Sequence, residues 1–149
     1  IEISQQLKQS VIDTLCDILI SENFGASMIM HSMSEPNVIK LFKHKKQMVG
    51  SDGLFSAKPH PRTYGAFPRV ISRFCNELKT IDIYDAIYKM TEFPALRFNL
   101  KNCGFLQKNQ RADILIFDSK KIKDTADYDN PKQSPVGIFK IIARGKVLK

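Results

Sequence analysis

A carboxylate flanked by glycines is the first feature of this chain that could do chemistry. Asp52 follows a short apolar stretch, residues 47 to 50, and Gly53 comes directly after it. The stretch predicts a buried strand, and in α/β barrels the C-terminal ends of strands hold the catalytic groups. Glycine at such a place lets the backbone pass close to a substrate. Asp also caps turns. The residues alone therefore allow two roles for Asp52, a catalytic one and a turn-capping one.

A second group of reactive side chains lies close together in residues 60 to 64. His60, Arg62 and Tyr64 offer an imidazole, a guanidinium and a phenol, and Pro59 and Pro61 stiffen the segment. A guanidinium suits a bidentate grip on a carboxylate. An ordinary surface loop with a solvated Arg62 is the alternative, and it stays open from the residue types alone.

Helices and strands must position these residues, and the sequence predicts the following series of them along the chain. Ser10, with Asp13 three residues later, is typical of a helix N-terminus. Predicted helices run from Ser10 to near Gly25, from Ser34, from Pro68 to about Leu78, from Asp82, and from Pro94 to before Gly104. Predicted strands are residues 26–30, 47–50 and 114–117, with a hairpin of 138–143 and 146–148. Residues 51–65 and 118–137 are expected to be loops.

Composition limits the class of protein. With 149 residues, 43% of them apolar, the chain can form one ordinary core but not a closed eight-stranded barrel, which needs about 250 residues. The net charge is +8, with a dense cluster at Lys40 and residues 43–46. No aromatic residues alternate with that cluster, so we expect a solvated helix end and no nucleic acid. Neither a membrane helix nor a signal peptide is visible, so a cytoplasmic setting without membrane partners is expected.

The cysteines are odd in number and widely spaced. Cys16, Cys75 and Cys103 contain no CxxC pair. This spacing argues against both a disulfide framework and a thiolate zinc site. We expect all three to be small buried or half-buried apolar residues.

Motifs along nearly the whole chain, taken together, resemble the C-terminal portion of one enzyme family. They are Gly50-Ser51-Asp52-Gly53, residues 59–62, 64–70, 86–91, Pro94-Ala95, residues 104–106 and 112–114, with further similarity at 32–35, Asp124 and Pro131. The joint pattern resembles the N-acyl-D-amino-acid deacylases, or D-aminoacylases, of the metal-dependent amidohydrolase superfamily. Each motif alone is weak, and the ordered series is specific.

This resemblance implies an α/β fold in two parts. Residues 1–103 would be the incomplete C-terminal part of an amidohydrolase (β/α)8 barrel, and residues 104–149 the C-terminal segment of a small β-sandwich domain. The complete enzymes would hydrolyse N-acyl-D-amino acids with a zinc-bound water. Asp52 would be the catalytic carboxylate that moves the proton, Arg62 would hold the substrate's α-carboxylate, and His60 would lie beside it in the substrate-binding segment.

The sequence departs from the family at the metal ligands. The family's HxH motif and its Cys and further His ligands belong to earlier barrel strands, and His31, His44 and His60 do not stand at those positions. We therefore expect no zinc on this chain alone, no independent activity, and a truncated product or excised fragment. His31 could contact the pocket or be structural.

Three expectations concern partners and geometry. The chain would self-associate or pair with a separate N-terminal barrel segment, because a slice of barrel leaves strand edges unpaired. The alternative to an enzyme portion is a non-catalytic remnant or self-associating module with a basic binding face. In the enzyme portion, Asp52 and Arg62 should share one rim without a direct ion pair, separated by a gap that fits a small amide.

Overall fold

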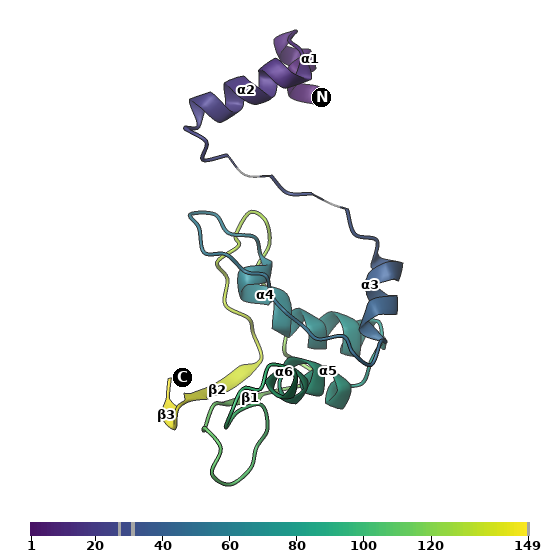
Figure 1. The fold of residues 1–149 in the computed structure, drawn as a ribbon, viewed down its shortest axis with the longest axis vertical. Coiled ribbons are helices and arrows are strands. Elements are labelled where there is room, and N and C mark those ends of the chain that lie inside the picture. The colour runs from purple at the N-terminus through teal and green to yellow at the C-terminus, as the bar shows by residue number, and fades with distance from the viewer. Residues whose placement is uncertain (27, 31, 149) are drawn as a thin grey trace. The chain divides into compact units, whose positions relative to one another are not determined.

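The first of two compact units is a pair of helices. The computed structural model describes residues 1–26, 28–30 and 32–148, and the chain divides into units Ile1–Met33 and Ser34–Lys149. In the first unit, α1 (Glu2–Leu7) packs on α2 (Val11–Ser21), as Figure 1 shows. Ser10 Oγ accepts the Asp13 N–H at 3.1 Å, which confirms the predicted N-cap. The helix ends at Ser21, short of the predicted end near Gly25.

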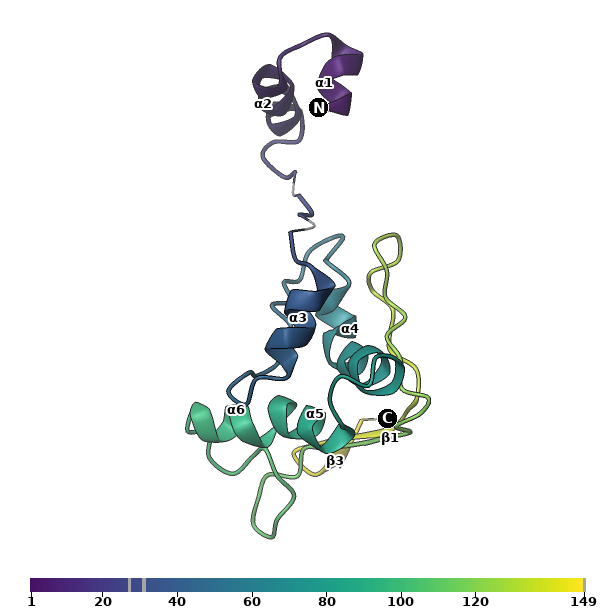
Figure 2. The same ribbon diagram turned by 90° about the vertical axis from the view of Figure 1, so that its right-hand side faces the viewer.

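The second unit contains the other helices and a small sheet. Its helices are α3 (Glu35–Phe42), α4 (Arg62–Arg69), η1 (Val70–Glu77), α5 (Ile83–Met90) and α6 (Glu92–Arg97). Ser34 and Asp82 precede α3 and α5 as predicted, and Asp82 Oδ1 accepts the Asp85 N–H at 2.9 Å. Phe42 of α3 stacks on Phe74 of η1, with ring centroids 4.2 Å apart, so these aromatic rings join the two helices. Figure 2 shows α3 beside α4, the helix that η1 continues.

The helix predicted from Pro68 begins six residues earlier, at Arg62. Pro68 lies inside it, and the wider π-helical turns of η1 follow directly. Proline has no N–H to donate to the preceding turn, so it disturbs the regular α-helical ladder. The Leu78 N–H accordingly reaches back five residues to Arg73 O at 2.8 Å. Arg62 therefore stands in the first turn of a helix and not on the predicted loop.

Neither of the two short strands predicted before residue 51 is a strand in the described residues. Residues 47–50 are extended, but the Val49 N–H donates to Lys89 O at 3.2 Å. Lys89 Nζ in turn donates to His44 O at 2.7 Å and Gln47 O at 3.3 Å. The backbone partners of this segment thus lie on α5 and not on a neighbouring strand. Residues 26 and 28–30 are irregular, and Ser27 and His31 lie outside the described residues.

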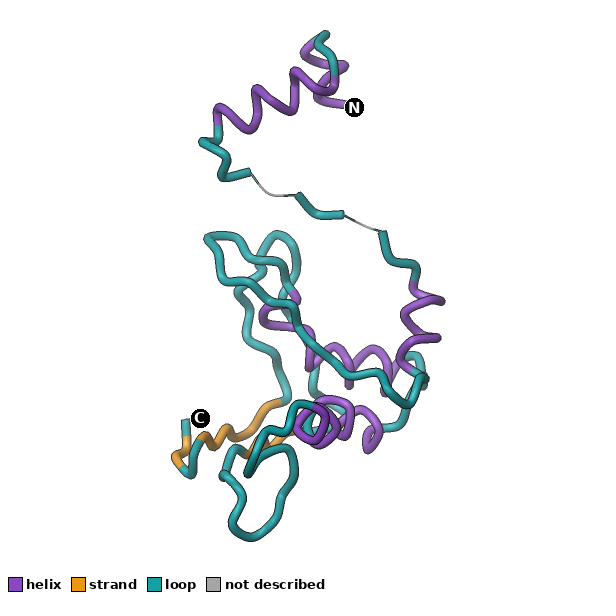
Figure 3. Tube along the Cα trace, viewed as in Figure 1, coloured by secondary structure: helices purple, strands orange, loops and turns teal. Residues whose placement is uncertain are grey.

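The sheet at the end of the chain is as predicted. Strands β1 (Ile114–Phe117), β2 (Ile138–Ala143) and β3 (Lys146–Val147) pair antiparallel in that order (Figure 3). Residues 118–137 form the expected long loop, narrowed by a bridge between Lys123 and Val136. Side chains of η1 and α5 form the core of the unit: Val70, Cys75 and Ala86 are buried, and Phe42, Val49, Ile81 and Met90 pack on them.

Surface features agree with the sequence in part. Lys40 lies in the last turn of α3, and Lys43 follows it directly, as expected of a solvated helix end. Cys75 is buried and Cys103 half-buried, but Cys16 is exposed, so the expectation for Cys16 was wrong. Cys16 lies on α2, whose helix neighbour within its unit is the short α1. In the part of the chain that the structure describes, every helix is too short or too polar to cross a membrane.

Candidate functional site

Asp52 and Arg62 meet directly at the start of α4. Arg62 Nη2 lies 2.8 Å from Asp52 Oδ2, and Arg62 Nε donates to the backbone carbonyl of Asp52 at 2.9 Å. The two residues are thus brought to one place, as predicted. The expected gap between them is absent, because the guanidinium binds both the side chain and the main chain of Asp52. The Asp52 side chain is 82% exposed and that of Arg62 is 41% exposed.

A close backbone approach places Asp52 beside the helix. A Cβ built on Gly53 would lie 2.9 Å from the Thr63 Cα, which is too close for any side chain. Thr63 Oγ1 also donates to Leu54 O at 3.3 Å. The glycine predicted to allow a substrate to approach therefore allows α4 to approach. The turn itself is held by Ser51 Oγ, which accepts the Gly53 N–H at 3.3 Å, while the Asp52 carboxylate points to Arg62.

His60 holds the first turn of α4 from the other side. Its Nδ1 accepts the Arg62 N–H at 3.0 Å, and its carbonyl accepts the Thr63 N–H at 3.0 Å. Nε2 lies 3.2 Å from the hydroxyl of Tyr128, and the two rings meet edge to face. Because Nδ1 is an acceptor here, a neutral imidazole carries its proton on Nε2 and donates it to Tyr128. His60 therefore acts on the backbone of Arg62.

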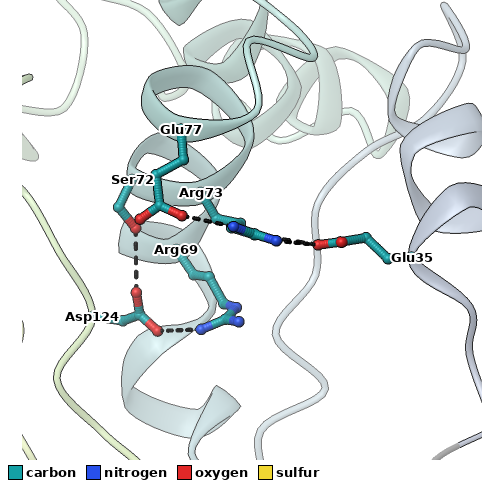
Figure 4. Close-up of polar contacts among 6 residues, drawn as sticks. All are labelled: Glu35, Arg69, Ser72, Arg73, Glu77 and Asp124. Atoms are coloured by element: carbon teal, nitrogen blue, oxygen red, sulfur yellow. Dashed lines mark hydrogen bonds and ion pairs between the residues drawn. The ribbon is translucent and has the colours of Figure 1, made fainter.

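A cluster of ion pairs and hydrogen bonds attaches the long loop, residues 118–137, to α4 and η1. Asp124, whose side chain is 11% exposed, accepts from Arg69 Nη1 at 2.9 Å and from Ser72 Oγ at 3.2 Å (Figure 4). Beside it, Arg73 joins Glu35 of α3 to Glu77, both at 2.8 Å. The hydrogen bonds that Arg73 donates to Glu77 and Glu35 raise the pKa of Arg73 above its ordinary value. The cluster fixes α3 and the long loop to the helix formed by α4 and η1.

The described residues do not fit a metal centre. Within ranges 1–26, 28–30 and 32–148, no three His, Cys, Asp or Glu side chains come together as ligands. A catalytic zinc takes about three protein ligands. We therefore assign no step of a reaction on this chain to a metal.

Asp124 and Tyr128 were not predicted as neighbours of the candidate site. They belong to a polar loop, and nothing in the loop's own composition indicates a contact with His60 or Gly65. The signal that could have revealed the contact is Gly65, a glycine three residues before Pro68 and inside the helix Arg62–Arg69. Glycine within a helix is unfavourable and indicates that another part of the chain comes close.

Comparisons with known proteins place the chain among hydrolases. The model of the Amidohydrolase family matches residues 14–148. The D-aminoacylase of Alcaligenes xylosoxydans xylosoxydans is 36% identical over 128 residues, which cover 85% of this chain and 26% of that enzyme. The N-acyl-D-glutamate deacylase of the same organism is 38% identical over 121 residues, covering 80% and 25%.

A solved structure matches as well. The N-acyl-D-glutamate deacylase of Bordetella bronchiseptica, crystallised with zinc and a phosphonate mimic of the tetrahedral intermediate, has a TM-score of 0.75 at 38% identity. The match covers 78% of this chain and 25% of that one. The chain thus spans about a quarter of the length of these relatives, in their C-terminal portion.

Proposed function

Because this chain belongs to the amidohydrolase family, we propose that it is the C-terminal portion of a zinc-dependent hydrolase that cleaves the amide bond of N-acyl-D-amino acids. The relatives that it matches carry the names D-aminoacylase and N-acyl-D-glutamate deacylase. The observation that carries the proposal is the match of residues 14–148 to these relatives, and in the structure Asp52 and Arg62, ten residues apart in sequence, come to one place at the first turn of α4. A base and a carboxylate-binding group side by side suit a substrate that has both an amide and a carboxylate.

The chemistry assigned to this chain is positioning and proton transfer. Arg62 would bind the α-carboxylate of the substrate through paired N–H groups. Asp52 would accept a proton from the water that attacks the amide carbon. As the C–N bond breaks, the same proton would pass to the leaving nitrogen, which releases a carboxylate and a free D-amino acid.

The ion pair between Asp52 and Arg62 opposes the simplest form of this assignment. It occupies the guanidinium that the substrate needs and keeps the carboxylate turned toward the helix. Exposed ion pairs, however, contribute only about 0–1 kcal/mol, and the Asp52 side chain is 82% exposed. A substrate carboxylate can therefore take the place of Asp52 at small cost, and the displaced carboxylate would then face the amide. We propose this exchange as the first step of binding.

For the architecture, we propose that residues 1–103 complete an amidohydrolase barrel and that residues 104–149 contribute to a small β domain. The support is the change from helices, the last of which ends at Arg97, to the antiparallel sheet of β1, β2 and β3, which begins at Ile114. In this arrangement the metal ligands come from residues other than those described. We therefore propose that the 149-residue chain alone binds no stoichiometric zinc and hydrolyses no N-acyl-D-amino acid. Turnover by the purified chain that a chelator abolishes would contradict this.

We further propose that a second polypeptide segment, either a separate barrel portion or another copy, covers apolar side chains of this chain. Several large ones are strongly exposed, among them Ile12 at 74%, Leu54 at 74% and Phe55 at 85%. Leu54 and Phe55 are neighbours in the sequence, and exposed apolar side chains that gather in a patch mark an interaction site. Light scattering on the purified chain tests self-association, and a stable monomer that also fails to bind a separate barrel segment would contradict the proposal.

A chimera tests the assignment of Arg62. Residues 14–148 would replace the matching C-terminal portion of the Alcaligenes D-aminoacylase. In this chimera, Arg62→Ala should raise KM roughly 10- to 100-fold with a much smaller change in kcat, since a charge-assisted contact is worth about 1.5–3 kcal/mol. Arg97→Ala, an exposed arginine at the end of α6, is the matched control and should leave KM unchanged. An unchanged KM in Arg62→Ala would overturn the assignment.

A further inference from the structure

The loop of residues 118–137 reaches the candidate site and is held there at several points. Figures 1 and 2 show the tip of this loop and the segment before α4 at the same end of the second unit. At the base of the loop, the Lys123–Val136 bridge holds the two sides of the loop together, and Thr125 Oγ1 donates to Ser134 O at 2.8 Å. Asp127 Oδ1 accepts the N–H groups of residues 129 and 130 at 3.0 and 2.6 Å. The tip is therefore a fixed turn.

The contact between Gly65 and Asp124 determines where the loop lies along α4. A Cβ built on Gly65 would lie 3.0 Å from the Asp124 Cβ and 3.9 Å from the Ala126 Cβ. The missing side chain of Gly65 lets the loop lie directly on α4, and the bonds of Asp124 to Arg69 and Ser72 keep it there. From this attachment, four residues of chain lead to Tyr128.

Tyr128 is joined to Arg62 through one imidazole ring. The Tyr128 hydroxyl lies 3.2 Å from His60 Nε2, and His60 Nδ1 accepts the backbone N–H of Arg62 at 3.0 Å. The ring centroids of His60 and Tyr128 are 5.2 Å apart and nearly perpendicular. Both ring nitrogens of His60 are thus engaged, so the ring has one orientation and one neutral tautomer, with its proton on Nε2.

We propose that Tyr128 is a positioning residue of the carboxylate-binding site: its hydroxyl fixes the His60 ring, and His60 fixes the first turn of α4, so that the Arg62 guanidinium stays directed at the substrate's carboxylate. The inference rests on the proposed function, in which Arg62 binds that carboxylate. It gives the C-terminal segment an indirect part in substrate binding, through the position of Arg62. Tyr128 itself has no place in the proton transfer.

Two measurements on Tyr128→Phe test this, with Tyr84→Phe as the matched control because the Tyr84 side chain on α5 is exposed. In the chimera, Tyr128→Phe should raise KM roughly 2- to 10-fold, the worth of one hydrogen bond, with kcat within about twofold. In the 149-residue chain itself, long-range ¹H–¹⁵N spectra should show the Nε2–H tautomer of His60. Tyr128→Phe should shift the Nε2 resonance and speed hydrogen exchange of the Arg62 amide, because the ring loses the contact on its Nε2 side. Tyr84→Phe should change neither.

The outcomes separate this inference from the proposed function. If Arg62→Ala leaves KM unchanged, the proposed function fails. If Arg62→Ala raises KM while Tyr128→Phe alters neither KM nor the His60 Nε2 resonance, the positioning role alone fails. If the Tyr128→Phe chimera does not fold, the spectra of the chain decide, and an unchanged Nε2 resonance with unchanged exchange of the Arg62 amide overturns the proposal. A fall in kcat with unchanged KM would also contradict it.

Discussion

Asp124 lies against Gly65 so closely that a methyl group on residue 65 would come within 3.0 Å of the Asp124 Cβ. Replacing glycine by alanine in a helix normally stabilises a protein by roughly 0.5–1 kcal/mol. Here the added group pushes on a side chain that Arg69 and Ser72 hold in place, and overpacking costs about 1–3 kcal/mol. Gly65→Ala should therefore lower the free energy of unfolding by about 1 kcal/mol, measured by urea denaturation.

The same substitution should also speed amide hydrogen exchange at residues 123–128, because the loop loses its seat on α4. Gly50→Ala is the matched control, since a Cβ built there meets no atom within 4 Å. It should leave both the stability and the exchange of the loop unchanged. A Gly65→Ala variant as stable as the parent, with a protected loop, would show that Asp124 can move aside without cost.

Lys89 offers a second test. It concerns the contact between α5 and residues 44–49, which is found where the sequence predicted a strand at residues 47–50. The residue is only 5% exposed, and its ammonium donates to His44 O and Gln47 O. Lys89→Met keeps much of the volume but removes both hydrogen bonds, which should destabilise the chain by about 1–2 kcal/mol. Lys101→Met, at an exposed position after α6, is the control. If Lys89→Met stabilised the chain, burial of the ammonium would outweigh its hydrogen bonds.

The environment of Asp113 leads to a prediction of how the stability of the chain changes with pH. Its Oδ1 accepts the Arg144 N–H at 2.7 Å, and this bond, with the neighbouring Arg111 guanidinium, lowers the pKa of Asp113 below its ordinary value of 3.8. A lowered pKa means that the stabilisation is present above the unfolded value of 3.8 and is lost as the pH falls through the folded pKa.

The loss of stability between pH 6 and pH 3, measured by urea unfolding, should therefore be smaller in Asp113→Asn than in the parent chain. Asp129→Asn, at an exposed position in the long loop, should keep the full pH dependence. Equal pH dependence in Asp113→Asn and the parent would mean that Asp113 does not contribute to acid sensitivity.

Local signals predicted most of the helices and the sheet. Ser10 and Asp82 carry their own capping chemistry, and Arg144-Gly145 forms the turn between the two strands of the hairpin, with positive φ at both residues. The failures lie where distant parts of the chain decide the structure. Residues 47–50 have the composition of a strand, but their partner is Lys89 on α5. Pattern alone does not say which element supplies the partner.

The closeness of Asp52 and Arg62 was predicted, but the contact between them was not. Asp52 and Arg62 come together, as the motif spacing suggested, yet they form the ion pair that was expected to be absent. The helix begins at Arg62 because residues 60 and 61 start it, with His60 Nδ1 accepting the Arg62 N–H. Pro59 and Pro61, with one residue between them, suggested a loop, and residue types alone do not show that the His60 ring accepts an N–H of the helix that follows.

The most direct test of the central claim is turnover by the chimera with Asp52→Asn. The parent chimera, folded and loaded with zinc, should hydrolyse N-acyl-D-amino acids. Asn keeps the shape of the side chain but cannot accept the proton of the attacking water, so kcat should fall by at least about 100-fold, the usual worth of a general base, while zinc content and substrate binding stay close to those of the parent. Near-normal kcat in Asp52→Asn, or a folded and zinc-loaded parent chimera without turnover, would contradict the account.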